Sequence, residues 1–481
     1  MKYVRLWILS IALLLSACAG APAAESWRFI VTCDSRGGYD PPMNAAILQE
    51  FVDEVISKGA DFFLFPGDMV SGYTTQGPAG LQAQLEAWLQ LMEPLYDAGI
   101  PVYVCRGNHE IMDVWGGYRP PGFDPNNSFA TAWLSVFGNP DRPRWMLPGN
   151  GPSGEQYMTY AVEHKNALIV VLDHYAGMQH KAINQCNQQW LDNQLAGNTK
   201  PHVFVAGQEP AFQALHTDCL GSKLAARDAF WASLMDAGAR IYLAGHDHFY
   251  DHARIDDGNG NPDDDLHQYI VGTGGAGTYA WSPPYLGTNS HYTVRQVAHS
   301  ANFGYLLVEI QDLNVTCTFM ARTYSNKNLP GVYLPADTWQ YTAATGPRIV
   351  SPNGGEYLTP GESTVIAWKT TEGIDIAEVR IEYSSDSGDN WNEVAVTPNM
   401  GSYDWFVPQA DSNACLLRIS NTLNPEQRDT TNAAFMIRPC LRDLKADLNN
   451  DCYVNHLDFL IMAEGWLDCA YPADPACNPQ P

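Results

Sequence analysis

Five short motifs in the first two thirds of the chain carry side chains that bind metal ions or transfer protons. They are Asp34-Ser35-Arg36, Gly67-Asp68, Gly107-Asn108-His109-Glu110, Gly207-Gln208-Glu209-Pro210 and Gly245-His246-Asp247-His248. Carboxylates, an amide and imidazoles together are suitable ligands for one or two divalent cations. The motifs therefore predict a hydrolytic centre built on two metal ions.

Most of these motifs follow an apolar run that is typical of a buried strand. The runs cover residues 27–32, 62–65, 102–104, 202–205 and 241–243. Amphipathic patterns at 44–57, 81–96 and 223–237 predict helices, so strands and helices alternate as in a layered α/β core. Because ligands at the carboxyl ends of successive strands converge on one crevice in an open α/β sheet, we expect the motifs to meet there.

The order of the motifs, with the specific sequences Gly-Asn-His-Glu and Gly-His-Asp-His, resembles the calcineurin-like metallophosphoesterase superfamily, which includes the purple acid phosphatases. The resemblance covers about residues 26–345. It implies an α/β fold in which two β-sheets form a sandwich flanked by helices, with the metals at the strand ends. It also implies an enzyme that hydrolyses phosphomonoester or phosphodiester substrates with a metal-activated water.

The resemblance further implies a role for each matched residue. Asp34 and His248 would bind the first metal, Asn108 and His246 the second, and the carboxylate of Asp68 would bridge the two. His109 matches the catalytic position that contacts the phosphoryl group and protonates the leaving oxygen.

Two residues depart from the family pattern. Arg36 stands where the first motif has a metal-binding histidine, and a guanidinium has no lone pair to offer a metal. Two roles stay open for Arg36: an ion pair with Asp34, or bidentate donation to a substrate phosphate, which would make it catalytic. Gln208 replaces the histidine of the fourth motif, so its amide oxygen becomes the predicted metal ligand and Glu209 a substitute.

These replacements remove one imidazole from each metal site. The predicted cofactor is one or two divalent metals among Mn, Mg, Fe and Zn, and the oxygen-rich ligand set favours Mn or Mg. Three states stay open: an active two-metal centre, a one-metal centre and an inactive centre. The alternative function is a catalytically impaired phosphate-binding or surface-assembly protein that docks to a partner through its tail.

Two segments near the motifs lack a catalytic pattern of their own. Residues 113–156 are rich in Pro, Gly, Asn and Trp and are interpreted as a long loop. This loop either lines the substrate side of the site or is an insertion that lies away from it. The glycine-rich residues 272–277 are not followed by Lys-Ser or Lys-Thr, which favours a tight loop beside the metal crevice over a phosphate cradle.

The amino terminus predicts export. Lys2 and Arg5 precede an apolar run at residues 6–15, which is too short to span a bilayer, so residues 1–17 are interpreted as a lipoprotein signal peptide. Leu15-Ser16-Ala17-Cys18 resembles a bacterial lipobox, which implies lipidation of Cys18 and a membrane anchor in the bacterial envelope, at the outer membrane or cell surface. The alternative is cleavage after Ala19 or Ala23 and full secretion.

Charge and cysteine content restrict the partners and the covalent links. The formal net charge of −26, from 53 acidic and 27 basic residues, argues against duplex nucleic acid as a partner. Export permits disulfides: the tail cysteines Cys440, Cys452, Cys469 and Cys477 are predicted to form two bridges in one of three pairings. Cys186 and Cys219 are predicted to pair, and Cys33 and Cys105 to be buried free thiols.

The pattern changes to short strands after residue 345. Period-two runs at 365–368, 379–383, 392–396 and 416–420, separated by turn residues, predict a β-sandwich over residues 346–438. This segment resembles the immunoglobulin-like or fibronectin-like accessory modules of secreted bacterial proteins.

Residues 439–481 form a small tail with the spacing of a calcium loop. The predicted ligands at positions 1, 3, 5, 7, 9 and 12 are Asp447, Asn449, Asp451, Tyr453, Asn455 and Asp458, and residues 457–467 continue as a helix. The tail resembles one repeat of a dockerin-like module, which implies bound calcium and a cohesin-like or cell-surface partner. Cys452 occupies position 6, where glycine normally supplies a positive φ, and only one loop is present. An acidic, solvated tail is the alternative.

Overall fold

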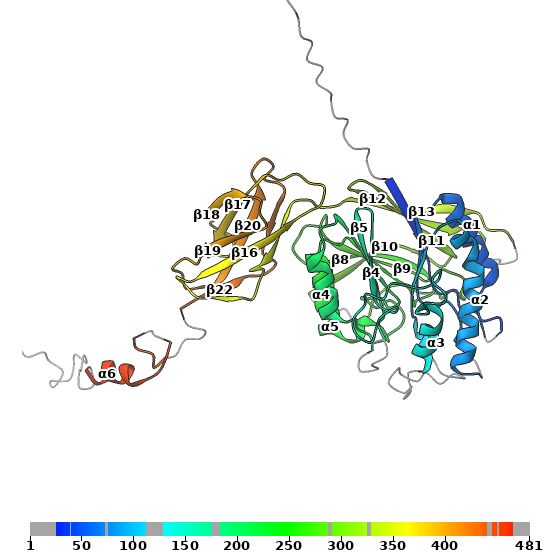
Figure 1. Cartoon of the computed structure of the whole chain (residues 1–481), viewed down its shortest axis with the longest axis horizontal. Coiled ribbons are helices and arrows are strands. Elements are labelled where there is room, and N and C mark those ends of the chain that lie inside the picture. The colour runs from blue at the N-terminus through cyan, green and yellow to red at the C-terminus, as the bar shows by residue number, and fades with distance from the viewer. Residues whose placement is uncertain are drawn as a thin grey trace, which may run out of the picture.

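A mixed α/β region opens the chain and a β-rich region follows it (Figure 1). The computed structural model describes residues 26–38, 40–72, 76–111, 128–175, 183–286, 291–324, 329–439, 445–449 and 452–464. The predicted signal peptide and Cys18 lie outside these residues, as do Asp451, Cys440, Cys469 and Cys477. Within the described part of the chain, no helix has the length and apolar composition needed to cross a membrane.

Two sheets form the α/β region. The first sheet has the order β13 (Tyr333–Thr342), β12 (Asn314–Arg322), β11 (Gly304–Gln311), β1 (Ser26–Val31), β2 (Phe62–Pro66) and β3 (Val102–Cys105). The second has the order β10 (Thr293–Ser300), β8 (Tyr250–Asp256), β9 (Leu266–Val271), β7 (Ile241–Ala244), β6 (His202–Gly207), β5 (Ala167–Leu172) and β4 (Tyr160–His164). Strands β1, β2 and β3 are mutually parallel, as are β5, β6, β7 and β9, so the carboxyl ends within each set lie along one edge of their sheet.

Helices cover the two sheets from opposite sides, as Figure 1 shows. The first sheet packs on α1 (Ala45–Lys58), α2 (Pro78–Asp97) and α3 (Ser128–Phe137), and the second on α4 (Gln188–Gly197) and α5 (Leu224–Asp236). Alternate residues of β5 enter different cores: Ile169 packs between the sheets, whereas Val170 packs under α4 and α5. A strand buried on both faces explains the unbroken apolar sequence at this position.

The three predicted helices are confirmed as α1, α2 and α5. In α1, Ile47, Phe51 and Val55 recur at helical spacing and are fully buried. The helix ends at Gly59, whose φ of 62° is left-handed and whose N–H caps the carbonyls of the last turn.

The segment 113–156 is not the continuous loop that its composition predicts. Helix α3 lies within it, with Trp133 and Phe137 buried against the first core and Phe129 one turn earlier. These aromatics recur every four residues and give α3 a buried face, a signal that the surrounding Pro, Gly and Asn residues obscure. Residues 112–127 lie outside the described part of the chain.

The β-rich region contains two packed sheets. One has the order β14 (Pro347–Ser351), β16 (Ser363–Thr370) and β19 (Ser402–Phe406). The other has the order β15 (Tyr357–Leu358), β22 (Phe435–Ile437), β20 (Ser412–Asn421), β17 (Glu378–Ser384) and β18 (Asn392–Pro398), and β21 (Arg428–Thr430) pairs with β20. Trp368 and Trp405 of the first sheet share a core with Ile381 and Leu417 of the second, and the four predicted strands fall within β16, β17, β18 and β20.

Two cations of the β-rich region contact helix ends of the α/β region. The Lys369 ammonium donates to the carbonyls of Leu195, at 2.8 Å, and Ala196, at 3.2 Å, in the last turn of α4. Arg348 donates to the carbonyl of Ala237, directly after α5. Because helix carboxyl termini carry partial negative charge and unpaired carbonyls, both contacts are favourable.

The cysteine predictions have mixed outcomes. Cys33 and Cys105 are buried free thiols, as predicted. The predicted Cys186–Cys219 bridge is wrong, since both thiols are free. Cys186 packs beside the core under α4 and α5, and Cys219 is buried at the start of the short 3-10 helix Leu220–Ser222, so each sulfur fills its own packing site. Cys452 is disulfide-bonded, to a partner outside the described residues.

Candidate metal centre

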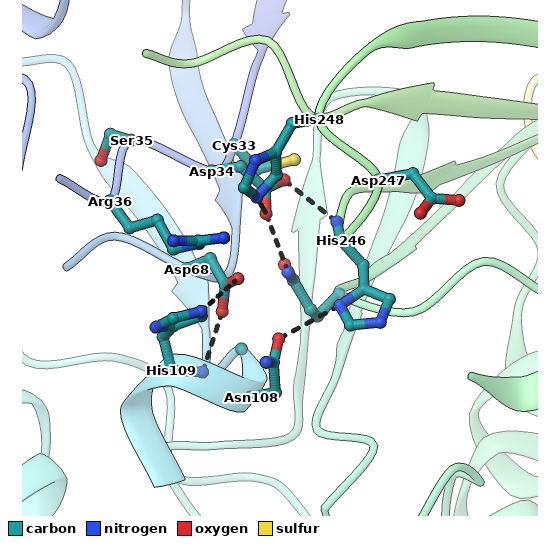
Figure 2. Close-up of polar contacts among 12 residues, drawn as sticks. Cys33, Asp34, Ser35, Arg36, Asp68, Asn108, His109, His246, Asp247 and His248 are labelled. Atoms are coloured by element: carbon teal, nitrogen blue, oxygen red, sulfur yellow. Dashed lines mark hydrogen bonds and ion pairs between the residues drawn. The ribbon is translucent and has the colours of Figure 1, made fainter. Parts of the chain in front are cut away.

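The motif residues meet because each follows a strand that ends at the same edge. Asp34, Asp68 and Asn108 come after β1, β2 and β3, whereas His246 and His248 come after β7. Figure 2 shows these side chains directed toward one another across the two sheets. The sheet packing therefore brings residues from the two halves of the α/β region into one cluster.

Three of these residues have an unusual backbone conformation. Asp34, Asp68 and His246 have φ values of 63°, 50° and 69°, in the left-handed region that residues with a side chain rarely adopt. Each such residue costs on the order of 1 kcal/mol or more and persists only where surrounding contacts enforce it. The gathering of three such residues at the ends of separate strands supports a functional site at this edge.

Backbone N–H groups hold one oxygen of each central carboxylate. Asp34 Oδ2 accepts from the His246 N–H at 3.0 Å, and Asp68 Oδ1 accepts from the His109 N–H at 3.0 Å. Gly107 and Gly245 permit this approach, because a Cβ atom there would lie 2.1 Å from Asp68 Oδ1 and 2.4 Å from Asp34 Oδ2. The second oxygen of each carboxylate remains directed toward the predicted metal ligands.

Asp34, Asp68 and His248 form a first ligand group, with one candidate ligand atom from each lying within 4.8 Å of the others. His248 Nδ1 lies 2.9 Å from the Gly277 carbonyl, which can only accept, so Nδ1 carries the hydrogen. The lone pair of His248 is therefore on Nε2, which lies 3.7 Å from Asp34 Oδ1. When Asp34 is ionised, the converging lone pairs have no hydrogen between them and fit a cation. The contact with Gly277 also places the glycine-rich segment 272–277 beside the crevice, as predicted.

Asn108, His246 and Asp68 form a second group. His246 Nε2 lies 3.4 Å from Asp218 Oδ1, so the hydrogen belongs on Nε2 and the lone pair on Nδ1. In the neutral imidazole, Nδ1 lies 3.1 Å from Asn108 Oδ1 as one acceptor facing another. Turning the amide would let its nitrogen donate to His246 Nδ1 at 3.1 Å and to Asp68 Oδ2 at 3.2 Å. The three side chains thus surround a point that needs either a hydrogen-bond donor or a cation, and they fit a metal ion.

Gln208 contacts the first group through its nitrogen. Its Nε2 donates to Asp34 Oδ1 at 3.1 Å, while its buried Oε1 has no hydrogen-bond partner among the described residues. In this orientation the Gln208 amide holds Asp34 in place through its nitrogen. Its oxygen, the predicted metal ligand, does not face the metal site at Asp34. Glu209 is also fully buried, and its backbone N–H donates to His174 Nδ1 at 3.1 Å.

Arg36 is held by an aromatic side chain. Its Nη2 donates to the Tyr279 hydroxyl at 3.0 Å, and the Tyr279 ring stacks on His248 with centroids 4.3 Å apart. The ion pair with Asp34, one of the two roles left open for Arg36, does not form among the described residues.

His109 and Glu110 occupy different places in the third motif. His109 Nδ1 donates to the Ser71 carbonyl at 2.6 Å, so Nε2, which lies 4.0 Å from Asp68 Oδ2, is the atom that faces the cluster. Glu110 accepts from the N–H groups of Gly107, Asp68 and Val70 at 2.7, 3.0 and 3.2 Å. Glu110 therefore ties the second motif to the third without entering the cluster itself.

Electrostatics in the cluster favour added positive charge. Burial, with the nearby Asp68 carboxylate, raises the pKa of Asp34 to about 8. Burial also acts to raise the pKa of Asp68, but the charges of His109 and Arg36 outweigh it and lower that pKa. Burial disfavours a charged His246, yet Asp218 raises the pKa of this imidazole to about 9, so a metal ion at Nδ1 would take the place of a proton. A divalent cation would relieve the repulsion between the two central carboxylates.

Three contributors were absent from the sequence-based site. Asp218 lies on the loop after β6, Tyr279 lies on the loop after β9, and Glu110 ends a motif whose pattern predicts roles only for Asn108 and His109. Position in the Gly-Asn-His-Glu motif was the signal available for Glu110. Asp218 and Tyr279 stand in no motif, so their roles depend on contacts between distant segments.

The predicted calcium loop is partly described. Asp458 Oδ1 accepts from the Leu448 and Asn449 N–H groups at 2.7 and 3.3 Å, and Oδ2 accepts from the Asn455 N–H at 2.7 Å. Cys452 has a φ of 71°, the positive value expected at position 6 of such a loop. Helix α6 (His456–Glu464) follows, where the sequence predicts one.

The calcineurin-like phosphoesterase family model matches residues 40–250. The matched segment begins after Asp34 and contains the other four motifs, from Asp68 to His248. No curated protein matches the chain significantly. The family match, over the segment that supplies most of the cluster, supports the calcineurin-like phosphoesterase superfamily that the motifs resemble.

Proposed function

We propose that the protein is a metal-dependent phosphoesterase that hydrolyses phosphoesters at the cluster around Asp68. One observation carries this proposal: hydrogen-bond acceptor atoms of five side chains converge on one place, and most of these atoms have no donor there. The five side chains are those of Asp34, Asp68, Asn108, His246 and His248. The family match to residues 40–250 supports the same reaction class.

The residues present suit two neighbouring cations. Asp34, Asp68 and His248 would hold one, Asp68, Asn108 and His246 the other, and Mn or Mg is favoured by the oxygen-rich set. Divalent ions held by these ligands would supply a water of lowered pKa and would neutralise charge on the phosphoryl group. His109 is fixed through Nδ1, so Nε2 is the atom that can pass a proton to the leaving oxygen.

Export, anchoring and docking belong to the same proposal. The amino-terminal pattern supports a lipid anchor through Cys18 in the bacterial envelope, and the loop around Asp458 supports a calcium-binding, dockerin-like tail. The β-rich region between them would be an immunoglobulin-like or fibronectin-like spacer.

The test replaces the shared carboxylate. Asp68→Asn should abolish both bound metal and the hydrolysis of 4-nitrophenyl phosphate and its bis-ester in the presence of Mn²⁺. Asp53→Asn makes the same chemical change at an exposed position of α1 and should alter neither. Bound metal is measured by elemental analysis, and folding by circular dichroism.

Two results would count against the proposal. Hydrolysis that survives Asp68→Asn would place the reaction elsewhere. A wild-type protein that binds inorganic phosphate but turns over neither ester with any of several divalent metals would favour the noncatalytic phosphate-binding alternative.

A further inference from the structure

The guanidinium of Arg36 forms no direct ion pair among the described residues, although the Asp68 carboxylate is close enough to interact with its charge. Its single hydrogen bond there is to the Tyr279 hydroxyl, and its buried Nε has no partner. The backbone of Arg36 is fixed independently, because its N–H donates to the Asp68 carbonyl at 3.2 Å and residue 36 forms an isolated bridge with Met43. An anchored arginine with most of its donors free suits an anion that arrives from outside.

The guanidinium is directed into the catalytic cluster. Figure 2 shows it between His248 and His109, beside Asp68, and its charge influences all three side chains. Tyr279 holds this orientation, since its hydroxyl accepts from Nη2 while its ring is stacked on His248 with an interplanar angle of 11°. A phosphoryl group within reach of His109 would therefore also be within reach of Arg36.

The two ester classes differ in what they offer to such a group. A phosphomonoester has three non-bridging oxygens and a charge near −2, because its second pKa is about 6. A phosphodiester has two non-bridging oxygens and a charge of −1, and its second alkoxy group takes the place of the third oxygen. A planar guanidinium gains from the extra oxygen and the extra charge, and it loses contacts where an alkoxy group stands instead.

We propose that the site selects phosphomonoesters, and that Arg36, positioned by Tyr279, binds the third non-bridging oxygen of the phosphoryl group. This inference rests on the proposed phosphoesterase function. Arg36 thereby has a substrate-binding role at the position where the superfamily places a metal-binding histidine.

The experiment compares two substrates with the same leaving group, 4-nitrophenyl phosphate and bis(4-nitrophenyl) phosphate. The wild type should prefer the monoester in kcat/KM. Arg36→Gln should lower kcat/KM for the monoester by about 10²-fold, the effect of removing one transition-state donor. The diester should lose much less, so that the selectivity ratio falls at least about tenfold. Arg295→Gln, at an exposed ion pair on β10, is the matched control and should leave the ratio unchanged.

Two more variants separate substrate binding from metal binding. Tyr279→Phe removes the hydroxyl and keeps the ring, so selectivity should fall by up to about tenfold, as expected for one hydrogen bond. Arg36→His restores the superfamily residue and should raise bound metal while it lowers monoester selectivity. Calorimetric titration with inorganic phosphate gives a readout independent of turnover: the wild type should bind it at least about tenfold more tightly than Arg36→Gln.

The outcomes distinguish this inference from the proposed function. Equal losses on both esters in Arg36→Gln, or wild-type preference for the diester, would overturn monoester selection while leaving phosphoesterase activity in place. Phosphate affinity that is the same in the wild type and Arg36→Gln would also overturn it. A failure of the proposed phosphoesterase function would instead appear in the Asp68→Asn experiment and in the metal content of the wild type.

Discussion

A buried ion pair next to the third motif allows us to predict a change in the free energy of unfolding, because its burial determines the magnitude. Arg106, directly before Gly107-Asn108, lies with its Nη2 2.6 Å from Oδ2 of Asp173, and the two side chains are 1% and 0% exposed. Arg106 follows β3 of the first sheet, whereas Asp173 follows β5 of the second. The pair therefore joins the two sheets at the edge that carries the metal centre.

Asp173→Asn should destabilise the α/β region by about 3–5 kcal/mol, because it removes the buried carboxylate that lies 2.6 Å from the Arg106 guanidinium. This is a large part of the about 5–15 kcal/mol that stabilises a typical protein. The double variant Arg106→Met/Asp173→Leu removes both charges and should recover most of that loss, since apolar pairs of similar size often replace buried ion pairs without cost.

The assay is denaturation by urea followed by near-ultraviolet circular dichroism. Since a chain with more than one domain need not unfold in one step, the transition of the α/β region is compared between variants. The matched control is Glu86→Gln, which breaks the Arg142–Glu86 pair of 2.7 Å with side chains 35% and 31% exposed, and should cost less than about 1 kcal/mol. The reasoning fails if Asp173→Asn costs no more than Glu86→Gln, or if the double variant is less stable than the single one.

Two further predictions concern histidines. Asp218→Asn should weaken metal binding by about 10–100-fold in calorimetric titrations, because it weakens the hold on His246 Nε2 that directs Nδ1 into the cluster; unchanged affinity would exclude this positioning role. His267, 3% exposed and 2.7 Å from His252 Nε2, has its pKa lowered to about 2, chiefly by burial. Below pH 6.5 the His267 imidazole is protonated in the unfolded chain but stays neutral in the folded protein. The free energy of unfolding should therefore fall by up to about 1.4 kcal/mol for each pH unit below 6.5. Chemical denaturation between pH 6.5 and 5 should show a shallower decline for His267→Gln, and parallel declines would contradict the assignment.

Local patterns in the sequence were sufficient for much of the fold. Strand-forming runs before the motifs, helical spacing in α1, α2 and α5, and alternation in the β-rich region each depend on neighbouring residues, and the structure agrees with them. The meeting of Asp34, Asp68 and Asn108 was predictable for a related reason, because the parallel strands β1, β2 and β3 place their carboxyl ends together. His246 and His248 follow β7 of the second sheet and join them only through the packing of the two sheets.

Predictions failed where the outcome depended on packing between segments. The aromatic face of α3 was obscured by loop-like composition around it, and its docking on α2 decides that it is a helix. Cys186 and Cys219 looked like disulfide partners in polar sequence, but each thiol is buried separately and free.

The sequence alone determined which ligand types follow which strands, since residue type and strand period are local properties. Only the tertiary structure decided how those side chains are used. Arg36 meets Tyr279 across 243 positions of the chain, and Gln208 turns its nitrogen to Asp34 across 174. Contacts of this kind depend on how two sheets pack against each other, and no pattern within either segment encodes that geometry.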